Sequence, residues 1–423
     1  MQTNAAVPAA GLLSSCPDFR FDIWSNEARA NPHPIYAEMR RLDPVHLTIE
    51  PKRGRPIWIL TRYDDCVAFL KDPRFGKDIH RKLPKSCANR WWREPDPADP
   101  ILLLNHHVAS LDPPDHSRLR GLVHKAFTPC RIERMRQHIE QIAATLLQAL
   151  PKVGPVDLIA AYAHPLPAIV VSELLGVPAS DRERFERWTK VILYCPERAQ
   201  TNAALGDFAH YLNTLIDRRT AAPEDDLISA LAAAEESGDR LSRPELLSML
   251  FLLLVAGHET AVNLIGNGVL ALLRHPEQLL RLRCQPALLR TAVEEMLRYD
   301  GPVDMTTNRW ALEDVEIRGM RIARGDMVWA SLVAANRDPL QFADPDRFDI
   351  AREPNRHVAF GFGIHACLGA MLARLEAAAA IGALVRRFPS LDLAVALEDL
   401  TWISGMMIVR GVTRLPVHCR VSA

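Results

Sequence analysis

The chain contains the stretch Phe360-Gly361-Phe362-Gly363-Ile364-His365-Ala366-Cys367-Leu368-Gly369, which places one cysteine in a glycine-rich loop, and a helix-forming run over 370–386 follows directly. Backbone N–H groups in such a loop, together with the positive N-terminus of the helix, are expected to favour the thiolate form of Cys367. The glycines lack side chains, so a flat and bulky group could lie against the loop backbone. A thiolate beside a flat group indicates a ligand of haem iron, because thiolate ligation favours cleavage of the O–O bond. An isolated free cysteine is more often a small buried core residue, but this sequence context favours the ligand.

The pattern Phe-Gly-x-Gly-x-His-x-Cys-Leu-Gly resembles the haem-binding signature of the cytochrome P450 family, and it matches at every fixed position. The resemblance is closest to the soluble bacterial members that tailor macrolides and other natural products. It implies a mainly α fold with a small β portion, in which a triangular helical prism holds a long central helix over the haem. It also implies that Cys367 is the axial ligand of the iron of haem b. Four further residues of the loop would then contact the cofactor, namely Phe360, Gly361, Gly363 and Gly369.

Bulk composition is typical of a soluble protein with free thiols. The 423 residues contain 51 Lys and Arg against 51 Asp and Glu, and 48% of them are hydrophobic. The lack of a basic excess argues against nucleic acid as a partner. The eight cysteines form no CxxC pair, which is typical of a reducing compartment and predicts a cytoplasmic location.

The chain shows no convincing linker, so we expect one catalytic domain over 21–423 after a flexible leader over 1–20. The first residues contain no basic segment of the kind that begins a signal peptide. The longest apolar run, 249–256, is much shorter than the roughly 20 residues that a membrane-spanning helix needs. We therefore expect no attachment to a membrane.

Hydrophobic periodicity predicts a mainly helical chain with short strands. Helices are expected at 34–41, 113–127, 131–150, 179–194, 201–219, 225–236, 243–274, 276–284 and 286–299. Strands are expected within 314–332, near 400–418, and in a hairpin formed by 45–49 and 56–61. Residues 82–110 have no regular pattern, and a long loop of this kind is often functional.

The helix expected at 243–274 is the central one. Ser242 and Glu245 form a capping box at its start, and the segment 246–256 is apolar on nearly all sides. Such a helix lies in the protein interior. Polar residues that follow in a buried helix need an explanation, because buried polar groups are costly unless they are satisfied.

Two explanations of the polar segment can hold together. The hydroxyl of Thr260 can bond the carbonyl of Ala256 and bend the helix locally. The family resemblance implies a second role, in which Ala256 and Gly257 form a groove over the iron. Glu259 and Thr260 would then be an acid–alcohol pair that delivers protons to bound O2.

Glu295 and Arg298 are three residues apart on a predicted helix, so they lie on one face and can form an ion pair. Alone this spacing is a weak signal, because most such pairs are solvated surface pairs. By the resemblance, the pair is buried and supports the loop that carries the thiolate. The third member is expected to be Arg347, with Arg352 as the alternative.

Haem carries two propionates, which need cationic or hydrogen-bonding partners. His116 and Arg120 are four residues apart on a predicted helix and therefore face the same way. A guanidinium group suits a carboxylate because it can bind both oxygens. By the resemblance, Arg309 and His365 are further propionate contacts.

The resemblance implies a monooxygenase that uses O2 and two electrons to hydroxylate or epoxidise a hydrophobic small molecule. A ferredoxin and its reductase are the expected electron donors, and a basic surface with Lys125, Arg131, Arg134 and Arg136 is a candidate docking site. We expect a monomer. Pocket walls are expected from the 82–110 loop, from 179–219, from 303–307 and from 404–408, with Val255, Met305, Met406 and Met407 among the apolar groups.

Three other readings stay open from the sequence. The same scaffold could catalyse coupling or isomerisation without net monooxygenation, or it could sense a ligand without turnover. The retained Glu259 and Thr260 argue against isomerisation, because that reaction needs no protons delivered to oxygen. A protein without haem would require all these motifs to be coincidental.

Overall fold

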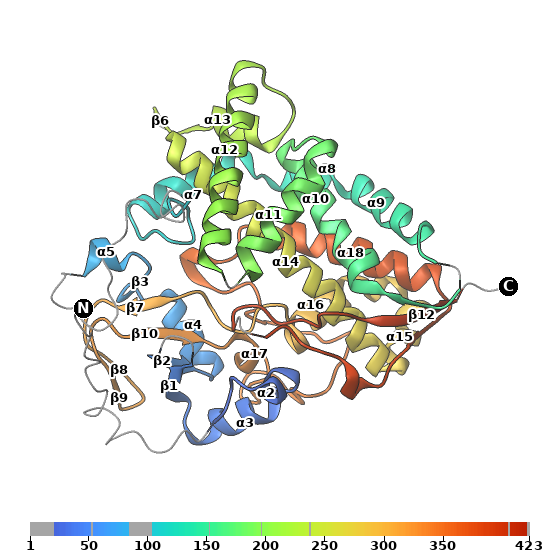
Figure 1. The fold of residues 1–423 in the computed structure, drawn as a ribbon. Coiled ribbons are helices and arrows are strands. Elements are labelled where there is room, and N and C mark those ends of the chain that lie inside the picture. The colour runs from blue at the N-terminus through green and yellow to red at the C-terminus, as the bar shows by residue number, and fades with distance from the viewer. Residues whose placement is uncertain are drawn as a thin grey trace, which may run out of the picture.

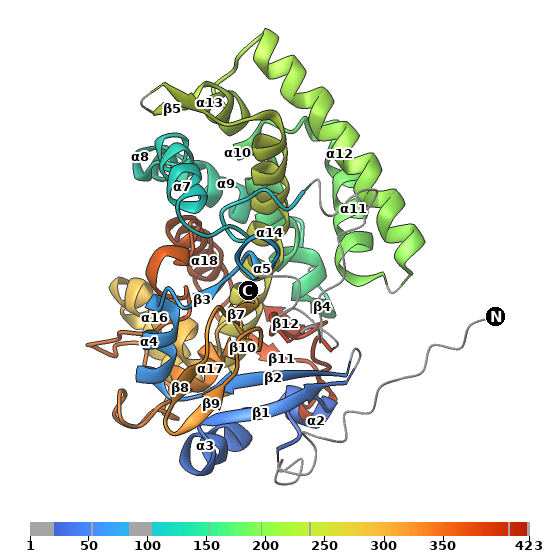
Figure 2. The ribbon, with the colours of Figure 1, turned by 90° about the vertical axis from the view of Figure 1, so that its left-hand side faces the viewer.

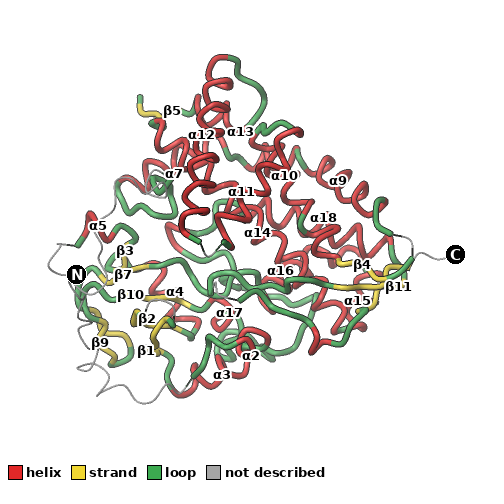
Figure 3. The backbone as a smooth tube through the Cα atoms, in the orientation of Figure 1, coloured by secondary structure: helices red, strands yellow, loops and turns green. Residues whose placement is uncertain are grey.

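The computed structural model describes residues 21–51, 54–83, 104–151, 153–195, 197–236, 238–404 and 407–420. The molecule has a triangular outline, with helices over most of it and strands gathered mainly at two corners (Figures 1 and 3). The leader predicted over 1–20 lies outside the described residues, as does most of the expected 82–110 loop.

The helices of the described residues form the larger part of the structure (Figure 3). Their bounds are α2 (Asn26–Ala30), α3 (His33–Leu42), α4 (Tyr63–Lys71), α5 (Ile79–Lys82), α7 (Asp115–Ala126), α8 (Pro129–Arg134), α9 (Arg136–Gln148), α10 (Pro165–Leu175), α11 (Arg182–Tyr194), α12 (Arg198–Ala221), α13 (Leu227–Ala233), α14 (Arg243–Arg274), α15 (Pro276–Cys284), α16 (Leu289–Asp300), α17 (Leu332–Ala335) and α18 (Ala370–Arg387). A π-helical turn, η1 (Ile159–Ala163), precedes α10, and short 3-10 turns lie at η2 (Ala179–Asp181), η3 (Pro286–Leu288), η4 (Gly363–His365) and η5 (Leu397–Asp399).

Most predicted helices are confirmed, but two differ in extent. The helix expected at 131–150 is wrong as a single element, because the chain turns at Met135 between α8 and α9. The backbone N–H of Met135 donates to the carbonyl of Ile132 at 3.0 Å, which tightens the last turn of α8. The helix expected at 225–236 ends at Ala233, and the chain continues into a short strand.

The main sheet has five strands in the order β1-β2-β10-β7-β3. It consists of β1 (Val45–Glu50), β2 (Arg55–Leu60), β10 (Met327–Ala330), β7 (Arg309–Ala311) and β3 (Phe75–Gly76). The predicted hairpin is confirmed, since β1 pairs antiparallel with β2 from Val45 opposite Leu60. Three smaller sheets pair β11 (Ser390–Leu393) with β12 (Pro416–Arg420) and β4 (Pro155–Asp157), β5 (Glu235–Glu236) with β6 (Asp239–Arg240), and β8 (Val315–Ile317) with β9 (Met320–Ile322).

Helix α14 runs through the middle of the molecule, as Figure 2 shows, and it packs against α10, α16 and α18. The predicted capping box is present, and the backbone N–H of Ser242 donates to Glu245 Oε2 at 2.8 Å. Its 32 residues span about 48 Å at roughly 1.5 Å per residue. Among the described residues it is the one helix long and apolar enough to cross a membrane, but 56% of its apolar window is buried inside the protein. This extent of burial is typical of a helix in the protein core.

Candidate active site

Residues predicted from the sequence meet at one large internal cavity. Its volume is about 1610 Å³, including its opening to solvent. Helix α14, the loop that carries Cys367 and the segment after α16 all contribute to its wall. The predicted site residues that line it are Arg120, Ala256, Gly257, Thr260, Arg309, Phe360, Gly361, His365, Cys367 and Gly369. Three others, His116, Glu259 and Gly363, lie outside the lining.

The loop before α18 is held in a fixed shape by its backbone. The N–H of Cys367 donates to the carbonyl of Phe360 at 2.9 Å, which closes the loop. Gly361 and Gly363 have positive φ angles of 68° and 74°, a conformation that residues with a side chain rarely adopt. A Cβ on Gly363 would also lie 2.6 Å from the carbonyl oxygen of Leu70, so this position requires glycine.

Cys367 lines the cavity and is exposed to it, although the thiol lies deep within the protein. Burial raises the pKa of the Cys367 thiol, and the backbone N–H of Gly369 and the charges of Arg120 and Arg374 offset only part of this effect. The loop N–H of Gly369 thus favours the thiolate, as expected from the sequence, but burial outweighs it among the protein groups. A metal ion bound to the sulfur would remove the proton outright.

Helix α14 presents a small-residue groove to the cavity. The hydroxyl of Thr260 donates to the carbonyl of Ala256 at 2.7 Å, which confirms the predicted local bond. A Cβ on Gly257 would meet only Val171, at 3.6 Å, so there is room beside the helix. Glu259 is set back from the cavity, where its Oε1 accepts from the side-chain amide of Asn263 at 3.3 Å.

Cationic and imidazole groups gather on another part of the wall. The rings of His116 and His365 lie 4.4 Å apart, and both ring nitrogens of the buried His116 lack a hydrogen-bond partner within the described residues. Arg120 Nε lies 3.1 Å from Nε2 of His124. Arg309 donates to the carbonyl of Leu70 at 3.2 Å.

Electrostatics in this part of the wall favour an anion. Burial and the nearby charges of Lys77 and Arg309 lower the pKa of His365 to about 2. Burial lowers the pKa of Arg309 to about 10, although the carboxylates of Asp112 and Asp72 oppose the shift. A negatively charged ligand at this place would stabilise the protonated, positively charged forms of His365 and Arg309.

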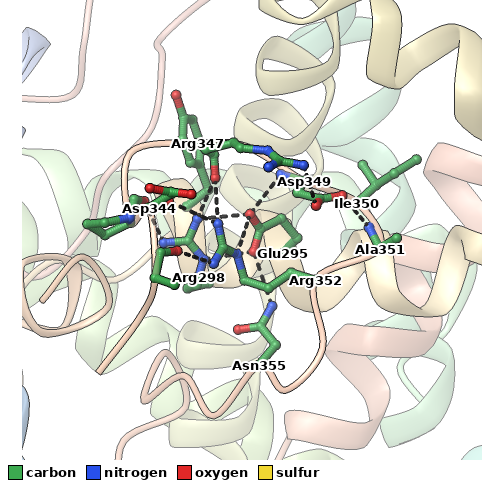
Figure 4. A network of polar contacts seen from close by, with 12 residues as sticks. Glu295, Arg298, Asp344, Arg347, Asp349, Ile350, Ala351, Arg352 and Asn355 are labelled. Atoms are coloured by element: carbon green, nitrogen blue, oxygen red, sulfur yellow. Dashed lines mark hydrogen bonds and ion pairs between the residues drawn. The ribbon is translucent and has the colours of Figure 1, made fainter. Parts of the chain in front are cut away.

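The predicted Glu–Arg pair is fully buried, with both side chains 0% exposed (Figure 4). Arg298 donates to Glu295 through Nε at 2.7 Å and through Nη2 at 2.8 Å. The remaining Nη1 of Arg298 donates to the carbonyl of Pro345 at 2.7 Å. These bonds tie α16 to the segment that precedes the Cys367 loop.

The assignment of Arg347 as third member of this network is wrong, and the alternative, Arg352, is found. Arg352 Nε donates to Glu295 Oε1 at 3.2 Å (Figure 4). Arg347 contributes only its backbone carbonyl, which accepts from Arg298 at 3.1 Å. Its side chain leaves in the other direction, is 63% exposed and pairs with Asp349 at 3.0 Å. The reason is geometric, because a carbonyl turned inward sends the side chain of the same residue outward.

Comparison with known proteins agrees with this geometry. The sequence profile described as "Cytochrome P450" matches residues 187–394. The chain is 47% identical over 402 residues to "Polyketide biosynthesis cytochrome P450 PksS" of Bacillus subtilis, with 94% of this chain and 98% of that protein covered. The chain belongs to the cytochrome P450 family. This P450 is also 46% identical over 397 residues to the vitamin D(3) 25-hydroxylase of Pseudonocardia autotrophica, with 94% and 96% covered. The solved structure of the myxobacterial cytochrome P450 CYP267B1 in complex with myristic acid has a TM-score of 0.86 at 48% identity and covers 93% of this chain and 98% of that one.

The family, its mainly α fold and its cofactor, haem b, are thereby confirmed as predicted. This P450 is a haem monooxygenase, and bacterial P450s take electrons from redox partners and act on hydrophobic substrates.

The cavity fits the cofactor. A Cβ on Gly361 would meet nothing within 4 Å, so the loop backbone is open to a flat group. The unpartnered nitrogens of His116 fit the propionates.

Sequence reasoning missed three groups near the site, of which Lys77 and Glu376 are poorly exposed to solvent and Glu294 is partly exposed. Lys77 lines the cavity and carries no motif that singles it out. Glu376 on α18 also lines it, and burial raises the pKa of its carboxyl to about 8. Glu294 pairs with Arg374 at 2.6 Å. The sequence offered one hint of this third group, since Glu294 directly precedes Glu295 in the predicted helix.

The apolar wall follows only part of the expectation. Val303 and Thr306 line the cavity, as predicted for 303–307. Met305 instead lies in the core cluster beneath the main sheet, together with Met407. Met406 lies outside the described residues.

Proposed function

We propose that Cys367 is the axial ligand of the haem iron in this P450 and that Ala256, Gly257 and Thr260 lie beside the oxygen-binding position. The observation that carries the proposal is that Cys367 and Thr260 line the same cavity from two different elements. When bound, thiolate-ligated haem uses O2, two electrons and two protons to place one oxygen atom in the substrate and to release the other as water. The protein supplies orientation, protons and a dry site.

The remaining cofactor contacts are proposed at residues that line the cavity, together with His116 and Gly363, which lie outside its lining. Phe360, Gly361, Gly363 and Gly369 form the bed of the thiolate loop, while His116, Arg120, Arg309 and His365 bind the propionates. Glu295, Arg298 and Arg352 support the loop from behind through the buried network described above. The side chain of Arg347 plays no part in that support.

Proton delivery is assigned to Thr260 and Glu259. Thr260 lines the cavity and donates its single hydroxyl proton to the carbonyl of Ala256, so to pass a proton on, the hydroxyl would turn that hydrogen from the carbonyl toward the cavity. Glu259 lies outside the cavity lining, bonded to Asn263, and is proposed as the acid that supplies protons to Thr260.

The substrate is proposed to be a hydrophobic natural product of the polyketide class. The relative PksS is named for polyketide biosynthesis, and the cavity wall contains Leu252, Leu253 and Val303. A screen of polyketide macrolactones, secosteroids and long-chain fatty acids by the spin-state change of the haem would test this choice. Tighter binding of secosteroids or fatty acids would overturn it.

Electrons are proposed to come from a ferredoxin and its reductase. Two of the four expected docking cations are neutralised, since Arg131 pairs with Asp225 at 3.3 Å and Arg136 pairs with Glu133. We therefore place the docking surface at the Cys367 loop itself, where Ile364 is 48% exposed and the exposed Lys71 lies nearby. A K71E variant is expected to raise the KM for ferredoxin without changing the haem spectrum.

The protein is proposed to be a cytoplasmic monomer with one catalytic domain over 21–423. The experiment that tests the whole proposal is the absorption spectrum of the reduced, CO-bound protein. Wild-type protein should show the red-shifted band of thiolate-ligated haem. A Cys367→His variant should retain haem and lose that band, and retention of the band would overturn the ligand assignment.

A further inference from the structure

Lys77 is a buried lysine at the cavity that neither the family motifs nor the assignments above explain. It follows strand β3, lines the cavity and is 8% exposed. Its Nζ donates to the hydroxyl and to the carbonyl of Thr307, the latter at 3.4 Å, and the described residues offer it no other side-chain hydrogen bond. A buried ammonium group normally pairs with a carboxylate, because an unpaired buried charge is costly.

The carboxylate next to it in the structure serves another purpose. Asp112 accepts the backbone N–H of Lys77 at 2.9 Å on each of its oxygens, and it accepts the N–H of Asp78 at 2.9 Å. Asp112 therefore fixes the backbone that carries Lys77 and makes no bond to Nζ. Close approach at this point is possible because residue 76 is glycine, where a Cβ would lie 2.8 Å from Asp112 Oδ2.

The neighbours of Lys77 are themselves cationic or imidazole groups. Arg309 and His365 line the same cavity, and the ring of His116 packs against that of His365. Burial and the charge of Arg309 lower the pKa of Lys77 to about 7, and Asp112 only partly opposes the shift. Cationic and imidazole groups thus gather at one part of the wall, and the carboxylates of Asp112 and Asp72 only partly offset their mutual effect.

We propose that Lys77 binds a carboxylate of the haem, so that Lys77 and Arg309 hold the same propionate edge. The proposal rests on the haem site proposed above. We favour a haem propionate over a substrate carboxylate as the ligand of Lys77. Lys77 lies on the same part of the cavity wall as Arg309 and His365, the two groups proposed above to bind the propionates. The hydrogen bond from Nζ to the hydroxyl of Thr307 fixes the end of the Lys77 side chain at the cavity wall.

The test compares four variants of the holoprotein, K77M, K77R, T307V and K82M. Lys82 is a matched control, since it is exposed and, within the described residues, its Nζ donates only to the carbonyl of Pro113, at 3.3 Å. Transfer of haem to excess apomyoglobin should be about tenfold faster for K77M, because a charge-assisted hydrogen bond is lost. K77R should stay near wild type, T307V should lie between the two, and K82M should not change.

A second readout is the haem reduction potential, measured by spectroelectrochemistry. Loss of the positive charge should make the potential of K77M more negative, because the charge favours the reduced haem. If K77M does not accumulate as holoprotein, K77Q takes its place. The proposal would be overturned if K77M or K77Q released haem at the wild-type rate and had the wild-type reduction potential. It would also be overturned if K77R were as defective as K77M.

Two further outcomes separate the sources of error. A K77M variant that keeps its haem and its potential but loses affinity for myristic acid, while affinity for the methyl ester is unchanged, would assign Lys77 to a substrate carboxylate instead. A wild-type protein without the thiolate–CO band would sink the haem site itself. In that case the failure belongs to the proposed function and not to Lys77.

Discussion

The carboxylate of Glu294 on α16 accepts two hydrogen bonds from the guanidinium group of Arg374 on α18, at 2.6 and 2.9 Å. Helix α18 begins directly after the Cys367 loop, so this pair fastens the helix on one side of the loop to α16. His357 adds a third bond to Glu294 at 3.1 Å from the other side of the loop. The loop is thus braced twice by consecutive glutamates, once by Glu294 and once by Glu295.

Replacing Glu294 by Gln should destabilise the protein in a pH-dependent way. Burial alone would raise the pKa of Glu294, but the hydrogen bonds from His357 and Arg374 outweigh it and lower the pKa to about 2. A depressed carboxyl pKa stabilises the fold above pH 4.5, and this stabilisation is lost as the pH falls toward 2. Since the pair is partly exposed, we expect E294Q to cost about 1–2 kcal/mol at pH 7.

Urea unfolding at pH 7 and at pH 3.5 would measure the difference between E294Q and wild type. The difference should shrink at the lower pH. E353Q is the control, because Glu353 makes an exposed pair with Arg290 at 3.6 Å and should contribute nothing measurable. Equal stability of E294Q and wild type at pH 7 would contradict the bracing role.

Arg352 and Arg347 should differ in a direct comparison of glutamine variants. R352Q removes a donor from the buried carboxylate of Glu295 and should cost about 1–3 kcal/mol. R347Q removes only an exposed side chain and should stay within about 0.5 kcal/mol of wild type. Thermal unfolding of the two holoproteins, followed by the haem absorption, would measure both. A larger loss in R347Q would restore the assignment made from the sequence.

That pair of arginines shows what sequence could and could not predict. The buried pair of Glu295 and Arg298 was predictable because their spacing places both on one helix face. The choice between Arg347 and Arg352 depends on which way a loop turns its carbonyls, and no local pattern carries that information. Lys77 was missed for a related reason, since only the tertiary fold brings it next to Arg309.

The elements of the fold likewise divide into those that the sequence marks and those that it does not. Helix α14 was predicted with its bounds because a capping box and His275-Pro276 mark its two ends. Helix α10 was missed, since it is apolar on most sides and has no periodic pattern, and its N-cap residue, His164, makes no side-chain capping bond. The break at Met135 between α8 and α9 was also missed, because neither glycine nor proline marks it.

Replacing Thr260 by Val should uncouple electron use from product formation. Valine keeps the volume and removes the hydroxyl that reaches the cavity, so proton delivery to bound oxygen should slow. We expect product formed per NADPH to fall several-fold and hydrogen peroxide to rise. T220V on α12 is the matched control, since Thr220 also donates to the carbonyl four residues earlier, at 2.8 Å, but is exposed. Full coupling in T260V would refute the assignment of the relay.

Asp304 links the N-terminal helices to the cavity wall through a buried ion pair with Arg29. Its fully buried carboxylate accepts from Arg29 Nη1 at 2.8 Å and from the hydroxyl of Tyr36 at 3.0 Å. The neighbouring residues Val303 and Thr306 line the cavity, so α2 and α3 anchor this part of the wall through Asp304. Removing one member of a buried ion pair leaves an uncompensated charge and typically costs about 3–5 kcal/mol. We therefore expect R29M to lose about this much stability at pH 7.

The pH dependence of the R29M variant has a defined sign. Burial raises the pKa of Asp304 even though Arg29 opposes the shift, and loss of Arg29 should raise this pKa further. A raised carboxyl pKa lowers stability as the pH rises above the unfolded value, so the gap between R29M and wild type should narrow from pH 7 to pH 5. R29M/D304N should recover part of the loss at pH 7, and the exposed Arg41, changed to Met, should have no effect. Urea unfolding of the four proteins at both pH values measures this, and a gap that widens toward pH 5 would show that the carboxylate of Asp304 is not the group left unpaired.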